Sequence, residues 1–333
     1  MRIIAATLSF MLLATSCHAQ NKNKKAFLSA EEAGRDFEIQ GEYSGKVGDG
    51  DKAVKIGIQV IAQGDGKFKS VGYIGGLPGD GWDGLPETRI PGSGQLEGDV
   101  CVLKSDNPDH KGRVEIADGN MKVFGPDDVQ VADLAKIVRQ SPTLGQAPPE
   151  GAVVLFDGSH ADEWQPAKIS DDKLLMQGVT SKQKFGSYKI HMEFRLSFMP
   201  FARGQGRSNS GFYNQGRYEI QILDSFGLEG KHNECGGIYT IKDPDVNMCF
   251  PPLSWQTYDI EYHAAKYDDD GKKTDHAWMT AKHNGVVVHE MTELDHATTA
   301  HPVKEGPEPG PIFFQDHGNP VRFRNIWVVP ISE

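Results

Sequence analysis

The chain has 333 residues, which is long enough for two domains, and its formal net charge of −11 is spread along the sequence without a basic stripe. This balance removes the attraction that dominates nucleic-acid binding, so nucleic acids are excluded as partners and neutral ligands are favoured. Mean hydropathy is −0.47, and beyond the N-terminus no segment has the roughly 20 apolar residues of a membrane-spanning helix. We therefore expect no transmembrane segment.

The first 19 residues have the layout of a secretory signal: Arg2, an apolar stretch over 3–14, and small residues up to Ala19. Cleavage after Ala19 predicts export to the periplasm or the extracellular space. The alternative is a lipoprotein signal that acylates Cys17, although its usual leucine would sit one place too early, at Leu13.

Residues 26–140 predict a β-rich N-terminal domain, whose role in substrate binding, domain docking or partner contact stays open. Apolar and polar residues alternate over 54–62, and Asp118-Gly119 separates two apolar runs as a hairpin turn would. The glycine-rich stretch 75–84 is interpreted as a long surface loop, since no phosphate-binding lysine or opening helix follows it. The one candidate for an amphipathic helix covers 129–138.

Residues 141–150 are rich in proline and glycine without a period, which predicts a linker to a C-terminal domain over 151–333. In that domain apolar residues alternate strictly over 188–198, and Asn284-Gly285 is a strong hairpin signal. Residues 268–271 lack the spacing of a calcium loop and predict a hairpin tip. The 38 glycines and 19 prolines lie between short apolar runs. We predict an all-β chain whose C-terminal domain is a jelly-roll sandwich, preceded by a smaller β-rich domain.

Three cysteines lie outside the predicted signal: Cys101, Cys235 and Cys249. Export would allow a disulfide between Cys235 and Cys249, worth about 3 kcal/mol for a loop of that size. Two buried thiols are the other interpretation, and both stay open. None of the three has metal-site spacing with histidine, so no metal site is assigned.

The strand predicted over 217–224 carries the groups best suited to chemistry. Glu219 and Gln221 lie about 6.6 Å apart on one face, together with Arg217, and Asp224 joins that face only if a β-bulge intervenes. The spacing resembles the Glu-x-Asp-x-x-Glu strand of laminarinase-type retaining glycosidases, with Gln and Asp replacing its second and third carboxylates. Retaining hydrolysis needs two carboxyl groups about 5 to 5.5 Å apart. The ordinary alternative is an exposed strand face with an ion pair.

Residues 210–227, Ser-Gly-Phe-Tyr-Asn-Gln-Gly-Arg-Tyr-Glu-Ile-Gln-Ile-Leu-Asp-Ser-Phe-Gly, resemble the central motif of the 3-keto-disaccharide hydrolase family, also described as 3-keto-glucoside lyase/hydratase domains. Residues 154–158 with Trp164, 255–260 and 315–327 agree in order, so the resemblance covers about 152–331. It implies a concanavalin A-like sandwich that acts on oligosaccharides or glycosides oxidised at C3.

The chemistry implied by this resemblance is removal of the acidic C2 proton, β-elimination of the C1 substituent and hydration of the resulting glucal, by an exported hydrolase or lyase. It needs a base, an enolate stabiliser and a proton donor, but no nucleophile. No cofactor is expected, although a divalent ion polarising the ketone would be chemically sensible. The predicted catalytic residues are Glu219, Asp224 and His317, and the predicted substrate-binding residues are Asn209, Tyr213, Arg217, Gln221, Trp255, Gln315, Asn319 and Arg322.

Two other functions stay open at this point. The same sandwich could be a non-catalytic glycan-binding module, with Trp255 or Tyr213 stacking on a sugar ring. It could also be a conventional retaining glycosidase built on Glu219 and Asp224. Turnover of oxidised and unoxidised sugars would separate the three.

Overall fold

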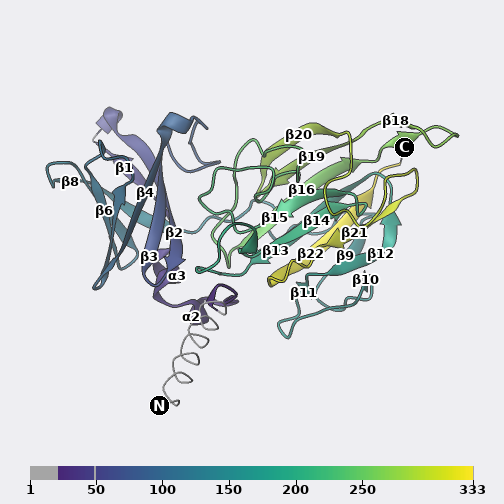
Figure 1. Ribbon diagram of the computed structural model, residues 1–333, viewed down its shortest axis with the longest axis horizontal. Helices are drawn as coiled ribbons and strands as arrows, with labels where there is room; N and C mark the ends of the chain where they lie inside the picture. The colour runs from purple at the N-terminus through teal and green to yellow at the C-terminus, as the bar shows by residue number, and fades with distance from the viewer. Residues whose placement is uncertain (1–21, 49, 333) are drawn as a thin grey trace, which may run out of the picture.

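The computed structural model describes residues 22–48 and 50–332, which form a β-barrel beside a larger β-sandwich (Figure 1). The barrel is antiparallel, and its strands follow the order of the chain. It is closed because β1 pairs with both β2 and β8. The two short helices α2 (Ala30–Ala33) and α3 (Arg35–Ile39) precede it. The barrel strands are β1 (Gly41–Val47), β2 (Val54–Gly64), β3 (Lys67–Ile74), β4 (Arg89–Glu97), β5 (Val100–Ser105), β6 (Arg113–Ala117), β7 (Asn120–Phe124) and β8 (Gln130–Ile137), with the 3₁₀ turns η1 (Gly50–Lys52) and η2 (Pro86–Thr88).

The barrel confirms the predicted hairpin at Asp118-Gly119, which joins β6 to β7 with φ angles of 50° and 75°. Positive φ at both central residues is what a two-residue type I′ turn requires. The candidate helix over 129–138 does not form, because this segment contains β8. Within it Ala132 and Leu134 are buried while their neighbours are exposed, and this period of two is that of a strand.

The sandwich consists of two antiparallel sheets around one apolar core, as the sequence predicts. Large aromatic side chains such as Trp164, Tyr188, Phe212 and Phe314 fill the space between the sheets. The first sheet, in spatial order, contains β10 (Trp164–Gln165), β12 (Val179–Phe185), β21 (Gly310–Phe314), β14 (Ser210–Asn214) and β15 (Tyr218–Ile222). The second contains β11 (Leu175–Met176), β22 (Val321–Pro330), β13 (Tyr188–Leu196), β16 (Trp255–His263), β19 (Ala277–His283) and β20 (Val286–Leu294), with β9 (Val153–Phe156) paired to β22.

Two turns of the sandwich also confirm their predictions. Asn284-Gly285, with φ angles of 50° and 79°, joins β19 to β20. Residues 268–271 form the tip between the short strands β17 (Lys266–Tyr267) and β18 (Lys273–Asp275). A further 3₁₀ turn, η3 (Gly204–Gly206), lies in the loop before β14.

The connection over 141–150 is fastened to the sandwich rather than loose. The Ser141 and Thr257 hydroxyl oxygens are 2.6 Å apart, and the Gly145 N–H donates to Oε1 of Glu193. Glu193 is fully buried beneath this segment. The connection therefore covers part of the outer face of the second sheet.

The glycine-rich stretch 75–84 is a loop, as predicted, but it lies only partly at the surface: Gly79, Gly81, Asp83 and Gly84 are exposed, whereas residues 76–78 are buried. Leu77 is fully buried in the core cluster that the sandwich shares with one side of the barrel. Gly79 has a φ of 71°, and a Cβ there would lie 2.6 Å from the sulfur of Met248. Glycine lets this loop approach the sandwich closely, so the loop packs between the two parts.

The predicted signal over 1–19, including Cys17, lies outside the described residues. Within the described ranges no helix is long and apolar enough to cross a membrane. Cys101, Cys235 and Cys249 are free and buried, so in the structure Cys235 and Cys249 are two buried thiols and not a disulfide.

Candidate active site

The β14–β15 hairpin presents its polar side chains on the outer face of the first sheet. Its register pairs Tyr213 with Glu219 and Gly211 with Gln221. Phe212, Ile220 and Ile222, which alternate with these residues, point into the sandwich core. Strand alternation therefore places Glu219 and Gln221 on one outward face, as predicted.

Glu219 is nevertheless buried, with 2% of its surface exposed. The chain folds back along β15, so that the N–H of Tyr239 donates to the carbonyl of Glu219, and the Glu219 N–H donates to Oγ1 of Thr298. This cover contradicts the alternative of an exposed strand face. Burial without a cation is costly for a carboxylate, so the environment favours the protonated form.

The Glu219 carboxyl group has one side-chain partner with a proton to give. The Tyr213 hydroxyl donates to Oε2 at 2.8 Å, and Nε2 of Gln315 donates to the Tyr213 oxygen at 3.2 Å. Burial raises the pKa of Glu219 to about 7, against a smaller lowering by the Tyr213 hydrogen bond. Burial and the adjacent Glu219 raise the pKa of the Tyr213 phenol, so Tyr213 stays a neutral donor. A carboxyl group tuned this way can accept and return a proton near neutral pH.

Gly211 makes the space that this carboxyl group occupies. A Cβ added at Gly211 would collide with Oε1 of Glu219 and would lie 3.0 Å from the Tyr213 ring. Only glycine fits beneath the Glu219 carboxyl group. In the sequence, this position is marked by the glycine that follows Ser210.

A group of amide side chains lies beside Glu219 on the same face. Gln221 donates to Oε1 of Gln205 at 3.2 Å, and Asn209 donates to the carbonyl of Gln205 at 2.8 Å. Asn319 accepts from the Asn209 N–H at 3.0 Å. Oδ1 of Asn209 is buried and, within the described ranges, accepts no hydrogen bond. A ligand hydroxyl would satisfy it. Sequence analysis missed Gln205, which lies in η3 without a distinguishing motif.

His317 lies in the loop after β21, at the edge of this face. The loop is held to β14 because the Gln315 N–H donates to the Gly211 carbonyl and Asn319 accepts from Asn209. His317 itself is exposed. The structure therefore brings the loop of His317, Gln315 and Asn319 to Glu219, as expected of a shared site.

Arg217 does not reach the Glu219 face. Its guanidinium donates to the carbonyls of Lys304 and Glu308 and to Oε1 of Gln215. Those partners lie at the end of the sandwich, so Arg217 anchors the 304–308 loop. The prediction that Arg217 binds substrate beside Glu219 is corrected accordingly.

Trp255 and Arg322 lie on the outer face of the other sheet. The Arg324 guanidinium stacks 3.9 Å from the Trp255 ring, and Arg322 donates to Gln177. The sandwich core separates both residues from Glu219. The expectation that they share a ligand with Glu219 is therefore not met by this arrangement.

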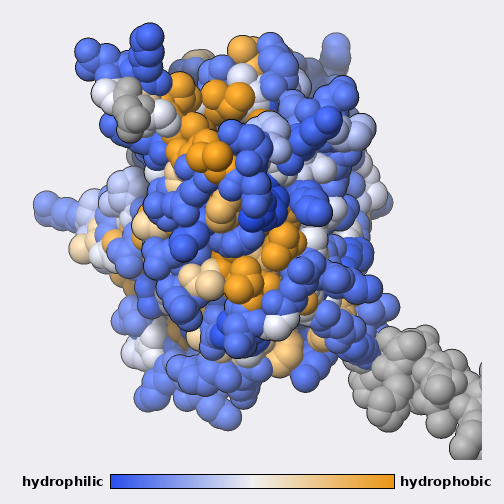
Figure 2. Space-filling view, turned by 90° about the vertical axis from the view of Figure 1, so that its left-hand side faces the viewer, coloured by the Kyte–Doolittle hydropathy of each residue, from blue (hydrophilic) through white to orange (hydrophobic). Residues whose placement is uncertain are grey.

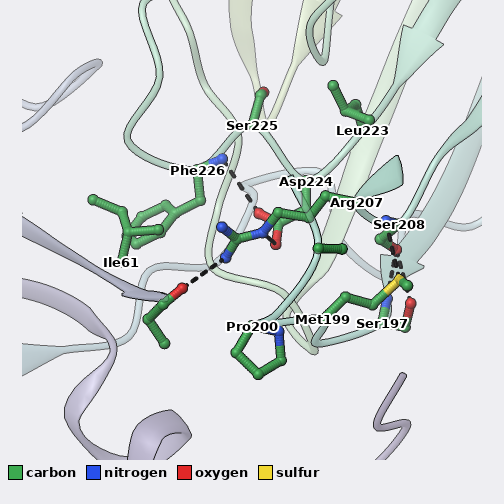
Figure 3. A network of polar contacts seen from close by, with 12 residues as sticks. Ile61, Ser197, Met199, Pro200, Arg207, Ser208, Leu223, Asp224, Ser225 and Phe226 are labelled. Atoms are coloured by element: carbon green, nitrogen blue, oxygen red, sulfur yellow. Dashed lines mark hydrogen bonds and ion pairs between the residues drawn. The ribbon is translucent and has the colours of Figure 1, made fainter. Parts of the chain in front are cut away.

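Asp224 also turns away from Glu219. The register between β14 and β15 is regular, so the bulge invoked to align the two carboxylates is absent from this pair of strands. Oδ2 of Asp224 accepts from Nε of Arg207 at 2.6 Å, and Arg207 reaches the Ala62 carbonyl of the barrel at 3.5 Å (Figure 3). No hydrogen bond or ion pair among the described residues joins Asp224 to Glu219. This placement opposes the two-carboxylate arrangement of a retaining glycosidase.

In the described part of the chain, no group of three or more His, Cys, Asp and Glu side chains is arranged to hold a metal ion. Glu219 has tyrosine and glutamine around it rather than further metal ligands.

The sandwich and its buried carboxyl group beside amide side chains are those of a carbohydrate-active enzyme. Residues 151–329 match the family model described as a 3-keto-alpha-glucoside-1,2-lyase-like domain. The chain belongs to this family.

Two crystal structures from Parabacteroides distasonis ATCC 8503, each named a "putative glycosyl hydrolase", are similar to it. The first is 30% identical, with a TM-score of 0.49, over 55% of this chain and 85% of its own. The second is 17% identical, with a TM-score of 0.41, over 56% of this chain and 99% of its own. No curated protein matches the chain significantly.

Proposed function

We propose that this enzyme cleaves glycosides oxidised at C3, with Glu219 as the base that removes the C2 proton. The observation that carries the proposal is the buried Glu219 carboxyl group, whose pKa is raised to about 7. A C3 ketone makes the C2 proton acidic enough for such a base. The family description, which names a 3-keto-glucoside lyase, supports the same substrate class.

The reaction proceeds in two stages. Glu219 takes the C2 proton, and the C–H electron pair forms an enolate on the C3 oxygen. The ketone then re-forms, a double bond forms between C1 and C2, and the C1–O bond breaks as the leaving oxygen gains a proton. Water next adds across that double bond, its hydroxyl on C1 and its proton on C2. The sum is hydrolysis of the glycoside.

The other residues of the face have supporting roles in this proposal. Tyr213 orients the carboxyl group and keeps its pKa from rising further. Asn209 and Gln221 bind sugar hydroxyls, and the unpartnered Oδ1 of Asn209 accepts from one of them. His317, on the loop that is held to β14, protonates the leaving oxygen. The signal-like sequence of residues 1–19 supports the further proposal that the enzyme is exported.

Purified full-length protein should convert 3-keto-trehalose and leave trehalose and a β-glucan intact. The products are followed by mass spectrometry, in which the glucal intermediate is lighter than the free keto sugar by the mass of one water. Release of reducing sugar from the unoxidised glycan would instead indicate a conventional glycosidase. Binding of all three without turnover would leave a glycan-binding module.

Tyr213→Phe should shift the pH dependence of kcat/KM upward. The Tyr213 hydrogen bond lowers the pKa of Glu219, so its loss raises that pKa, and the ionised base appears only at higher pH. For a shift of one pKa unit, activity falls about tenfold well below the pKa and recovers on the alkaline side.

Tyr188→Phe is the matched control, because it removes a buried hydroxyl that bonds Asn214 inside the sandwich. It should lower stability without moving the pH profile. An unchanged profile in Tyr213→Phe would rule out the proposed coupling between Tyr213 and Glu219.

A further inference from the structure

The barrel is filled with side chains at one end only. Phe198 of the sandwich and Ile39 of α3 close that end, where inward-facing residues such as Phe68 and Met121 are fully buried. Toward the other end, inward-facing Ile58 is only half-buried although it is apolar. An eight-stranded barrel is just wide enough to be filled by its own side chains or to hold one small ligand.

Small residues leave the second end unfilled. In the inward-facing rows Ile58 pairs with Gly72, Gly72 with Ile90, and Ser70 with Gly92. Where larger side chains would meet across the barrel, a cavity of about 270 Å³ remains. For comparison, an engineered cavity of about 150 Å³ holds benzene, so this one has room for a molecule of two aromatic rings.

The walls of this cavity are apolar. Ile56, Ile58, Ile90, Val114 and Val123 line it from the four strands β2, β4, β6 and β7. Figure 2, which looks onto the barrel side of the molecule, shows hydrophobic side chains gathered on this face between hydrophilic ones. An apolar pocket that opens to solvent within a polar rim is typical of a ligand site.

The charges around the cavity do not favour an ion inside it. Arg113 lies at the rim, and its guanidinium is paired with Glu115 and Asp128. Lys104 and His110, also at the rim, are exposed to water. A free sugar would bury several hydroxyls against carbon, and a buried hydroxyl without a hydrogen-bond partner is unfavourable.

We propose that the open end of the barrel is a binding site for a small uncharged aromatic or alicyclic molecule. It is separate from the Glu219 face, and the inference does not depend on the proposed function. It gives residues 26–140 a role in binding a second, apolar ligand.

The test uses 1-aminonaphthalene, a two-ring probe that is uncharged at neutral pH and whose fluorescence shifts to shorter wavelength in apolar surroundings. The full-length protein should bind it saturably at one site. Gly72→Ile should weaken binding at least about tenfold, because the new side chain fills the cavity. A Cβ at Gly72 would meet only Ile90, at 3.6 and 3.7 Å, which is ordinary contact, so the strand can accept it.

Gly186→Ile is the matched control, because a Cβ at Gly186 has no atom within 4 Å and the site lies in the sandwich. It should bind the probe as the parent does. Val123→Phe is the second cavity-filling variant, for use if Gly72→Ile fails to fold. It narrows the cavity from another wall and should weaken probe binding to the same extent. The inference is overturned if the parent shows no saturable binding, if a folded cavity-filling variant binds with unchanged affinity, or if excess trehalose displaces the probe.

Discussion

Glu219→Gln should reduce turnover of a 3-keto glycoside by about a thousandfold, within the 10²–10⁴-fold range of general acid–base catalysis. Glutamine keeps the shape of the side chain and can still accept from Tyr213, but it cannot take a proton from C2. Single-turnover measurements, with folding checked by circular dichroism, would test this. Full activity in this variant would rule out Glu219 as the base.

The same substitution should stabilise the protein at alkaline pH. Glu219 titrates near 4.5 when unfolded and near 7 when folded, so the folded state holds the proton more tightly. The free energy of unfolding of the parent therefore falls as pH rises through that window. Because glutamine cannot ionise, the variant should be more stable than the parent at pH 8, on the order of 3 kcal/mol, and should lose this advantage near pH 4.5.

Urea unfolding at the two pH values measures the difference. Glu261→Gln is the matched control, since Glu261 lies on the second sheet, pairs with Lys189 at 3.0 Å and has a lowered pKa. Glu261→Gln should leave turnover unchanged. It should not stabilise the protein at alkaline pH, because the pKa of Glu261 is lowered in the folded state. A stability difference in Glu219→Gln that is equal at both pH values would contradict a raised pKa.

Local pattern was sufficient to predict the part of the site that lies on one hairpin. Alternation along β15 places Glu219 and Gln221 on one face, and the same alternation, with Tyr213 opposite Glu219, holds in the structure. Hairpin turns were equally predictable at Asn284, because a two-residue turn with positive φ needs residues that tolerate it.

What the sequence could not predict depends on contacts between distant segments. Trp255 belongs to β16 of the second sheet, and sheet membership is not encoded in a strand's own pattern. The loop positions of Gln205 and Arg207 gave no signal either. The candidate helix over 129–138 is β8 in the structure, because this segment pairs with β1 and β7 and closes the barrel. Such tertiary pairing outweighs local preference.

Asp224→Asn should destabilise the fold by about 3–5 kcal/mol, the usual cost of removing one partner from a buried ion pair. The side chains of Asp224 and Arg207 are 0% and 7% exposed. Removing the Asp224 carboxylate leaves the Arg207 guanidinium without the group that pairs with it. Arg203, whose pKa is lowered by burial and by the charge of Arg207, lies close enough to repel that guanidinium. Asp245→Asn, at an exposed pair with Lys242, should cost less than about 1 kcal/mol.

The activity of the same variant separates the two roles open to Asp224. The Asp224 carboxylate binds Arg207, which contacts the barrel, and it does not face Glu219. The folded Asp224→Asn variant should therefore keep most of the parent's turnover of the keto sugar. The urea concentration at the unfolding midpoint should fall by a similar amount in Asp224→Asn and in Arg207→Met, because both substitutions break the same ion pair. If the folded variant instead lost turnover as fully as Glu219→Gln, Asp224 would act on the substrate, and the ion pair would have to open for it to do so.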